Sequence, residues 1–376
     1  MNHVDPITLH AETLVFDAHT DTLQRVLVDG VDLGARSTGD PLIERADLPR
    51  YREGGVDAQV FAVWVDTIFL PDHGARRALE QIDAFHRFVS DNESKVGLAR
   101  TAKDVRRLRE EGRFAALLSI EGGDAIERSL GVLRLYHRLG ASSMTLCHSR
   151  STDWVDSSTD TPRWDGLNEL GKEVIREMNR LGMVVDVSHA SNAAVRDVLA
   201  ASEAPVIASH SNCRALCDHP RNLSDDLLAA IAHTGGVVGI NFYAGFVSQP
   251  YLDEFRETFK DVFSWLNAPP PVEPEELDRV ARERLYGMSE GATLARPPFD
   301  MILDHIDHAV AVAGIDHVGI GTDLDVPHLA TPQGFDDVTD FPLITVGLQA
   351  RGYSAEEIAK IMGENFVRVF EEVTEG

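Results

Sequence analysis

The sequence predicts an α/β protein built as a (β/α)8 TIM-like barrel, with insertions after strands 1 and 7. Eight short runs rich in Val, Ile, Leu or Phe recur along the 376 residues, and most are apolar on both faces, as buried parallel strands are. Segments with helical period separate most of these runs. Eight strands that alternate with helices favour a closed barrel over an open doubly wound sheet. No Gly-rich dinucleotide fingerprint follows the first run, which also weighs against the open sheet.

Each predicted strand is a short apolar run, and most of these runs end in polar residues. In chain order the runs are TLVFDAH (13–19), DAQVFAVWV (57–65), FAALLSIEGG (114–123), SSMTLCHS (142–149), MVVDVSHAS (183–191), APVIASHS (204–211), GGVVGINFY (235–243) and DHVGIGTDLD (316–325).

The predicted helices have apolar residues at helical spacing, and two of them carry capping signals. They cover residues 74–90, 102–111, 168–181, 192–200 and 225–234, together with a last helix near the C-terminus. Ser224 is placed to cap the helix that starts at Asp225, and Ser354 with Glu357 makes a capping box before the last helix.

The chain is longer than a barrel needs. A (β/α)8 barrel takes about 250 residues, so about 120 are extra. They fall after the first run, at 22–54, and after the seventh, at 244–299, where NAPPPVEPEELD lies between two helix-like stretches. Neither insertion is large enough for a core of its own. We therefore expect one barrel domain over residues 1–376, with an inserted helical and acidic loop at about 244–299.

Composition excludes some partners and suggests a compartment. The formal charge is −26 and no Lys/Arg-rich tract offsets it, so a nucleic-acid partner is not expected. The N-terminus lacks a basic flank before an apolar core, and no uncharged stretch reaches membrane-spanning length. We expect a cytoplasmic protein without a membrane partner, and leave a homo-oligomer open. Cys147, Cys213 and Cys217 are expected to be buried free thiols; a small zinc knot of the last two with His210 is the alternative.

Candidate site residues gather where the predicted strands end, which is where barrel enzymes place their chemistry. His19 and Asp21 are two apart, so an extended strand points both the same way. Alone, this triplet is better explained as a polar strand end that meets solvent. However, four of the fifteen histidines lie at these few positions. The residues at the strand ends are His19, Asp21, Glu121, His148, His189, His210, Asn241, Tyr243 and Asp323.

The number of potential ligands predicts two metal ions. One ion in a hydrolytic site takes about three protein ligands and a water, whereas this chain offers five: His19, Asp21, Glu121, His189 and His210. Glu121 is the expected bridge, because a carboxylate has two oxygens to share and an imidazole has one free nitrogen. Two cations about 3.5 to 4 Å apart hold a hydroxide near neutral pH. We expect two Zn²⁺ ions, with other divalent metals as alternatives.

The combination of motifs resembles the membrane dipeptidase (renal dipeptidase) family, the M19 metallopeptidases of the amidohydrolase-like barrel class. The similarity covers most of the chain, and its pieces are specific only in combination. They are FDAHTDT, SIEGGDAI, MTLCHSRSTDW, DVSHAS, ASHSNCRAL, HPRNLSDD, VGINFY, VGIGTDLD and GENFVRVF.

The resemblance implies a zinc-dependent dipeptidase whose substrates include L,D-dipeptides. Such an enzyme cleaves the peptide bond with a hydroxide that bridges two metal ions. It assigns one zinc to His19, Asp21 and Glu121, and the other to Glu121, His189 and His210.

The resemblance also implies roles for three further residues. His148 lies near the scissile carbonyl and can donate to the oxyanion, Arg221 binds the substrate carboxylate, and Asp323 hydrogen-bonds the bridging water. Asp323 can also move the proton from that water to the leaving amine.

Other polar residues are ambiguous in the sequence. Tyr243 and Trp154 are candidates for the pocket wall, with core packing an equal alternative. Asp17 is expected to be a partner of a ligand, and His219 to shape the loop that presents Arg221.

Four further polar residues complete this set. His305 and His308 are expected on a solvated helix face. Asp186 and Asp325 are further candidates for supporting the ligands.

One departure from the family and two alternative functions remain. After Asp323 the family usually shows Asp-Phe-Asp-Gly, whereas this chain has Asp-Leu-Asp-Val at 323–326, which predicts a different loop. Another binuclear amidohydrolase, acting on a non-peptide amide, lactone or ester, would use the same metals. Arg221, and the lack of a lysine at the end of the third or fourth run, favour the peptidase. A non-catalytic descendant is the other alternative, and the intact set of candidate residues weighs against it.

Overall fold

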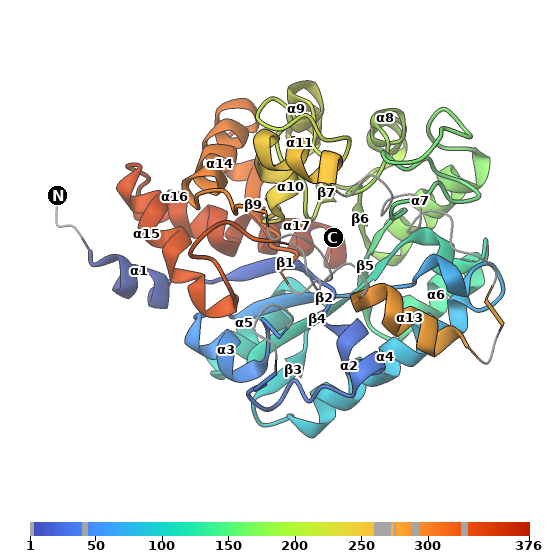
Figure 1. Ribbon diagram of the computed structural model, residues 1–376, viewed down its shortest axis with the longest axis horizontal. Coiled ribbons are helices and arrows are strands. Elements are labelled where there is room, and N and C mark those ends of the chain that lie inside the picture. Colours follow the sequence, from blue (N-terminus) through green and yellow to red (C-terminus); the bar gives the residue numbers. More distant parts are fainter. Residues whose placement is uncertain (1–3, 40–43, 259–271, 274–275, 287–293, 325–329) are drawn as a thin grey trace.

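The computed structural model describes residues 4–39, 44–258, 272–273, 276–286, 294–324 and 330–376, and shows a closed parallel barrel (Figure 1). β2 pairs with both β1 and β4, so the ring closes through β1, β2, β4, β5, β6, β7, β8 and β9. The predicted (β/α)8 barrel is confirmed. The strands are β1 (Phe16–Thr20), β2 (Ala58–Trp64), β3 (Val96–Leu98), β4 (Phe114–Glu121), β5 (Ala141–Thr145), β6 (Val184–Asp186), β7 (Val206–Ala208), β8 (Val237–Ile240) and β9 (Val318–Ile320).

The short strand β3 was not predicted from the sequence. It pairs with residues 114–116 of β4, and β5 pairs with β4 from Leu118 onward. β3 therefore extends the sheet beside the first half of β4 and takes no place in the ring. Its three residues are too few to give a periodic signal.

Helices surround the ring (Figure 1), and the five predicted with explicit bounds are present within one residue of those bounds. The capping box of Ser354 and Glu357 is confirmed. Ser224 stands at its expected N-cap position, but its hydroxyl donates to the Asp226 carboxylate and accepts no backbone N–H. The helices are α1 (Pro6–Glu12), α2 (Leu23–Asp29), α3 (Leu48–Glu53), α4 (Gly74–Asp91), α5 (Ala102–Glu110), α6 (Leu130–Arg138), α7 (Glu169–Leu181), α8 (Asn192–Ala201), α9 (Asp225–His233), α10 (Ala244–Val247), α11 (Gln249–Thr258), α13 (Leu277–Tyr286), α14 (Asp300–Ala313), α15 (Pro342–Ala350), α16 (Ala355–Ala359) and α17 (Asn365–Thr374).

The inside of the barrel is filled at the end where the strands begin. Side chains from the first residues of the strands, Phe16 among them, pack with Phe366 and Phe370 of α17. The rings of Phe16 and Phe366 stack with centroids 5.6 Å apart. Since this end is closed by apolar packing, polar chemistry is confined to the other end, where the strands stop.

A bulge in β1 decides which way its histidine faces. Phe16 and Asp17 pair with Ala58 and Gln59, but Thr20 pairs with Phe61, so β1 has one extra residue between Asp17 and Thr20. Strict alternation from the inward Phe16 would place His19 on the outer face together with Asp17. Because of the extra residue, His19 turns into the barrel instead.

The two predicted insertions form short helices at the barrel's rim. Residues 22–54 contain α2 and α3, and residues 244–299 contain α10, α11 and α13. α13 contacts α2 and the 3₁₀ turn Thr67–Phe69, and Arg284 Nε donates to Asp66 Oδ2 at 2.8 Å. The second insertion thus reaches from the end of β8 to the loop after β2.

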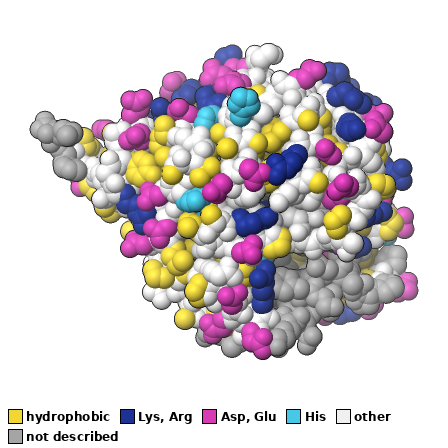
Figure 2. Space-filling view, turned by 90° about the horizontal axis from the view of Figure 1, so that it is seen from above, with side chains coloured by type: hydrophobic (Ala, Val, Ile, Leu, Met, Phe, Trp, Pro, Cys, Tyr) yellow, Lys and Arg dark blue, Asp and Glu magenta, His cyan; other side chains and the backbone are white. Residues whose placement is uncertain are grey.

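On the face shown in Figure 2, acidic and basic side chains are interspersed. Among the described helices, none combines the length and the apolarity needed to cross a membrane.

Candidate metal centre

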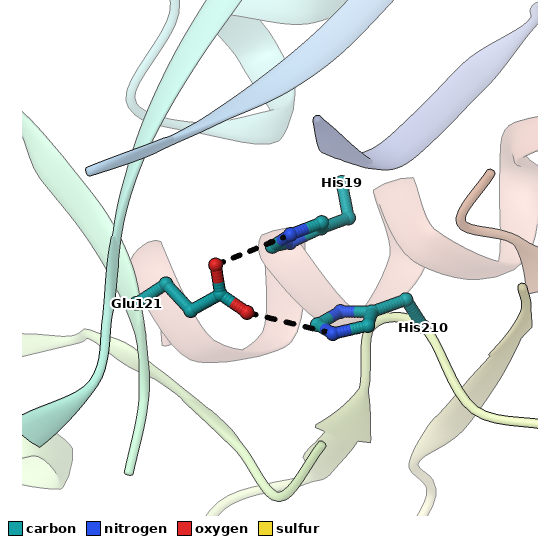
Figure 3. A group of neighbouring side chains, drawn as sticks. All are labelled: His19, Glu121 and His210. Carbon is teal, nitrogen blue, oxygen red and sulfur yellow. Dashed lines mark ion pairs between the residues drawn. The ribbon is translucent and has the colours of Figure 1, made fainter. Parts of the chain in front are cut away.

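Three histidines and one glutamate from four strand ends meet inside the mouth of the barrel, and Figure 3 shows His19, Glu121 and His210 of this group. His19 Nε2 lies 3.4 Å from Glu121 Oε2, while His189 Nε2 and His210 Nε2 lie 3.1 and 3.5 Å from Glu121 Oε1. His19 belongs to β1 and Glu121 ends β4, whereas His189 and His210 follow β6 and β7. Asp21 Oδ2 lies 3.9 Å from His19 Nε2. The five residues that the sequence predicts as ligands are therefore close together, with Glu121 in the middle.

Hydrogen bonds fix the tautomer of His210. Asp186 Oδ2 accepts from the hydroxyls of Thr145 (2.5 Å) and Ser209 (2.6 Å), so the Ser209 proton is used. Ser209 Oγ lies 2.8 Å from His210 Nδ1 and must accept from it. The neutral imidazole then carries its proton on Nδ1 and turns the Nε2 lone pair toward Glu121. This is the form in which histidine binds a metal.

Several buried polar atoms in this cluster lack a hydrogen-bond partner. They include His19 Nε2, Asp21 Oδ1 and Glu121 Oε2. In addition, the Nε2 atoms of His189 and His210 are only 3.0 Å apart. Potential ligand atoms of His19, Glu121 and His210, and of His19, Asp21 and Asp323, lie within 4.8 Å of one another. A buried polar atom without a partner costs about 1 to 3 kcal/mol, and a divalent cation would satisfy these. Imidazole nitrogens with carboxylate oxygens are a donor set that suits zinc.

Burial and mutual charge perturb the titration of these groups. Burial, and then the charge of Asp21, raise the pKa of Glu121 to about 8. Burial would lower the pKa of His19, but the charges of Glu121 and Asp21 outweigh it and raise this pKa well above its usual value. Burial holds the pKa values of His189 and His210 well below the usual range, so both are neutral at pH 7. The cluster thus combines neutral ligands with carboxyl groups whose charge a cation would stabilise.

Asp323 follows β9 and is held beside the cluster by its backbone and its neighbours. Its Oδ1 lies 3.8 Å from His19 Nε2, and its Oδ2 accepts from Asn241 Nδ2 at 2.9 Å. The residue adopts a left-handed φ of 55°, and its amide donates to the His19 carbonyl. Thr322 beside it donates through its amide and hydroxyl to Asp17, at 2.8 and 2.6 Å. Burial raises the pKa of Asp323 to about 6, which suits a group that both takes and gives a proton near neutrality.

His148 lies at the edge of the same cluster. Its ring centroid is 4.3 Å from that of His189, and the Trp64 ring meets it edge-on with centroids 5.3 Å apart. Burial lowers the pKa of His148 to about 4, so the imidazole is neutral at pH 7 and has one N–H to donate.

Arg221 provides a buried positive charge beside the cluster. Its side chain is 5% exposed, NH1 contacts Ser211 Oγ at 3.4 Å and NH2 donates to the His210 carbonyl at 3.1 Å. Nε has no hydrogen-bond partner, and the guanidinium lies over the ring of Phe246. Within the described part of the chain, no carboxylate forms an ion pair with it. A buried guanidinium of this kind is prepared for an anion brought by a ligand.

Two of the residues that were ambiguous in the sequence pack away from the cluster. Tyr243 packs against Phe246, Tyr251 and Phe255, one layer behind Arg221. Trp154 is fully buried and packs in the core.

Supporting residues contact the cluster through intermediaries. Asp17 contacts the backbone amide of His19 and Thr322, whereas Asp186 contacts Ser209. His219 accepts from the Arg221 amide at 3.0 Å, in agreement with its expected role in that loop. Asp325 lies outside the described residues.

The expectation for His305 is wrong. Its side chain is buried, and its ring bonds to the amide of Cys213 and the carbonyl of Val247, because α14 packs against α9 and α10 on this side. His308 instead lies nearer the surface and bonds to Asp225. All three cysteines are free and buried, as expected, and Cys213 and Cys217 donate to backbone carbonyls.

Sequence reasoning missed three residues of the site. Ser209 and Thr322 position His210 and Asp323, but serine and threonine beside a strand end are too common to stand out. Trp64, the last residue of β2, contacts His148. The signal for Trp64 was present, since it is the last residue but one of the predicted run 57–65 and so lies at a strand end, as the metal-site residues do.

Comparison with known proteins gives the family. The family model of the membrane dipeptidases, peptidase family M19, matches residues 6–376. The chain belongs to this family. It is 33% identical over 347 residues to dipeptidase verJ of Clonostachys rogersoniana, covering 89% of this chain and 77% of that protein.

Solved structures agree with this assignment. The crystal structure of the probable dipeptidase PvdM from Pseudomonas aeruginosa has a TM-score of 0.82 at 28% identity, covering 98% of each chain. A metallo peptidase from Rhodobacter sphaeroides, liganded with a phosphinate mimic of the dipeptide L-Ala-D-Ala, has a TM-score of 0.78 at 27% identity, covering 96% of this chain and 99% of that one.

Proposed function

We propose that this protein is a zinc-dependent dipeptidase with a binuclear metal centre. Family membership supports a metal-dependent hydrolase that acts on small peptides. In the proposed centre, His19, Asp21 and Glu121 hold one Zn²⁺, and Glu121, His189 and His210 hold the other. The two sides of the Glu121 carboxylate, each facing its own histidines at 3.1 to 3.5 Å, support the bridging role.

The chemistry follows from residues around this centre. When bound, the cations lower the pKa of a coordinated water and polarise the scissile carbonyl. Asp323, held by Asn241 at 2.9 Å, accepts the proton of the attacking water and returns it to the leaving amine. His148 donates its N–H to the oxygen that becomes negative during attack. Arg221 binds the substrate carboxylate with parallel hydrogen bonds and so sets the length of the peptide.

The observation that carries the proposal is the buried Arg221 guanidinium, which lies next to His210 without a carboxylate partner among the described residues. A dipeptide has a free carboxylate a few bonds from the peptide bond, so the same molecule can reach both Arg221 and Glu121. A lactone or a simple amide has no such group. This distinction favours a dipeptidase over another binuclear amidohydrolase.

The test is a turnover screen of L,L- and L,D-dipeptides at defined zinc content. We expect hydrolysis that a chelator abolishes and that added zinc restores. Activity that persists in metal-free protein would refute the mechanism. Hydrolysis of lactones or esters with no turnover of dipeptides would favour the alternative amidohydrolase.

Acceptance of a D-residue in the second position is part of the proposal. The phosphinate mimic of L-Ala-D-Ala bound by the Rhodobacter sphaeroides relative supports it. We further propose that residues 1–376 form one domain that acts in the cytoplasm.

A further inference from the structure

Trp64 points into the barrel at the level of the proposed metal centre. It pairs laterally with Glu121, and lateral partners in a parallel sheet face the same side. Alternation along β2 agrees with this, because Ala58 and Val60 belong to the core inside the barrel while Phe61 and Val63 belong to the outer layer. The indole therefore forms part of the wall of the active-site mouth.

The indole N–H of Trp64 is buried and has no hydrogen-bond partner. Buried indole N–H groups usually find one. The backbone of Trp64 is not free to shift toward a partner, because its carbonyl accepts from the side chains of Gln24 and Gln81. The ring meets the His148 ring edge-on, with centroids 5.3 Å apart and planes at 61°. An unused donor thus lies beside the residue expected to contact the reacting carbonyl.

The position of Trp64 in the ring indicates which part of a dipeptide reaches it. β2 and β7 are four steps apart in the closed ring of eight, so they lie on opposite sides of the mouth. Arg221 extends from the loop after β7. A dipeptide whose carboxylate is bound by Arg221 and whose peptide bond lies at Glu121 therefore directs its amino-terminal residue toward β2.

The acceptors of such a dipeptide can be assigned one by one. The carboxylate is used by Arg221 and the scissile carbonyl by the metal centre and His148. The α-ammonium group is a donor and cannot accept from Trp64. The remaining acceptor is an oxygen on the side chain of the amino-terminal residue. An anionic side chain is disfavoured there by the carboxylates of Asp21 and Asp323, which leaves a neutral oxygen.

We propose that Trp64 is a specificity-determining residue: its Nε1–H donates to a neutral oxygen on the side chain of the dipeptide's amino-terminal residue. The inference rests on the proposed dipeptidase function and adds a substrate class to it. Peptides that begin with Thr, Ser, Asn or Gln are preferred over isosteric apolar ones.

The first experiment compares Thr-Ala with Val-Ala. The two peptides have nearly the same shape, because threonine carries a hydroxyl where valine carries a methyl group. A hydrogen bond of ordinary strength predicts that the zinc-loaded wild type favours Thr-Ala by about 3- to 10-fold in kcat/KM. Trp64→Phe removes the donor and keeps an aromatic wall. It should bring the ratio of kcat/KM for the two peptides close to one, because Thr-Ala loses a hydrogen bond that Val-Ala never makes.

Trp164→Phe is the matched control, because the Trp164 indole donates to the Thr152 carbonyl at 3.1 Å and the residue is exposed. Its ratio should equal that of wild type. A wild type without preference, a preference that survives in Trp64→Phe, or an equal loss for both peptides would overturn the inference while dipeptide hydrolysis stands. Failure of the wild type to hydrolyse any dipeptide would remove the proposed function as well.

A spectroscopic readout tests the contact without turnover. The chain has four tryptophans, so a ¹H–¹⁵N spectrum shows few indole signals, and Trp64→Phe identifies the one from Trp64. In the zinc-loaded Asp323→Asn protein, Thr-Ala should shift that signal downfield and Val-Ala should not. The same shift with both peptides would mean that the indole senses occupancy alone, and would contradict the proposal.

Discussion

Replacing Arg221 with methionine separates recognition of the substrate carboxylate from every other property of the site. Arg221 is 5% exposed, and its guanidinium donates to the His210 carbonyl at 3.1 Å and to Ser211 Oγ at 3.4 Å. It therefore meets a substrate carboxylate away from water. Methionine keeps much of the volume beside Phe246 and removes the charge and all donors.

The size of the effect follows from the kind of contact. A hydrogen bond to a charged group contributes about 1.5 to 3 kcal/mol, and removing one partner of a buried charged pair costs about 2 to 5 kcal/mol. For a bidentate contact we expect a loss of about 3 to 4 kcal/mol, or roughly 10²- to 10³-fold in kcat/KM for Ala-Ala. Ala-Ala amide already lacks the carboxylate, so its hydrolysis by Arg221→Met should stay within a few fold of wild type.

The assay is the ratio of kcat/KM for the free and amidated dipeptides, measured with zinc content in parallel. Arg196→Met is the control, since the side chain of Arg196, on α8, is exposed and pairs with the equally exposed Asp226 at the surface. It should leave the ratio unchanged. An equal loss for both substrates, with zinc retained, would show that Arg221 acts only on the shape of the site, and its assignment would fall.

Three further predictions concern proton transfer, metal binding and stability. Asp323→Asn should lower kcat by about 10²- to 10⁴-fold while both metals remain bound; loss of one metal on elemental analysis would show that Asp323 is a ligand. Zinc binding to metal-free protein at pH 7 should release protons, because the pKa of Glu121 is raised to about 8. Calorimetry in buffers of different ionisation enthalpy measures how many protons are released. Release of no proton would contradict the bridging role of Glu121. Above the usual pKa of a glutamate, the unfolded chain has lost the proton of Glu121, whereas the folded metal-free protein still holds it. The stability that this proton gives the folded state is therefore lost as pH rises to about 8. The Tm of metal-free protein should therefore fall between pH 6.5 and 8, and Glu121→Gln should remove that part of the slope.

The sequence predicts the barrel and the metal cluster for the same physical reason. Strands buried on both faces give continuous apolar runs, and their ends are the only places where the polar chemistry of a barrel can sit. His19, Glu121, His189 and His210 therefore stand out without any structure. The bulge in β1 was not predicted, because an extra residue in a strand leaves no mark on composition. Strict alternation predicts that Asp17, His19 and Asp21 share one face of the strand. His19 and Asp21 do lie together, at 3.9 Å, but the bulge turns His19 into the barrel and away from the side of Asp17.

Contacts between distant segments were the part that sequence could not supply. His305 has the spacing of a solvated helix face, yet α9 and α10 cover it. The Asp186–Ser209–His210 chain joins two strands, and only their pairing reveals it. Trp64 lies opposite Arg221 because the ring closes between β2 and β4. Periodicity reports how one segment is buried and carries no information about which other segment buries it.

The central claim is that Glu121 is shared by two cations inside the mouth of the barrel. Anomalous diffraction at the zinc edge, from crystals of the zinc-loaded protein, tests it most directly. We expect two peaks about 3.5 to 4 Å apart, one beside His19 and Asp21, the other beside His189 and His210, with Glu121 touching both. A single peak at full occupancy, or a Glu121 carboxylate that contacts neither ion, would contradict the account.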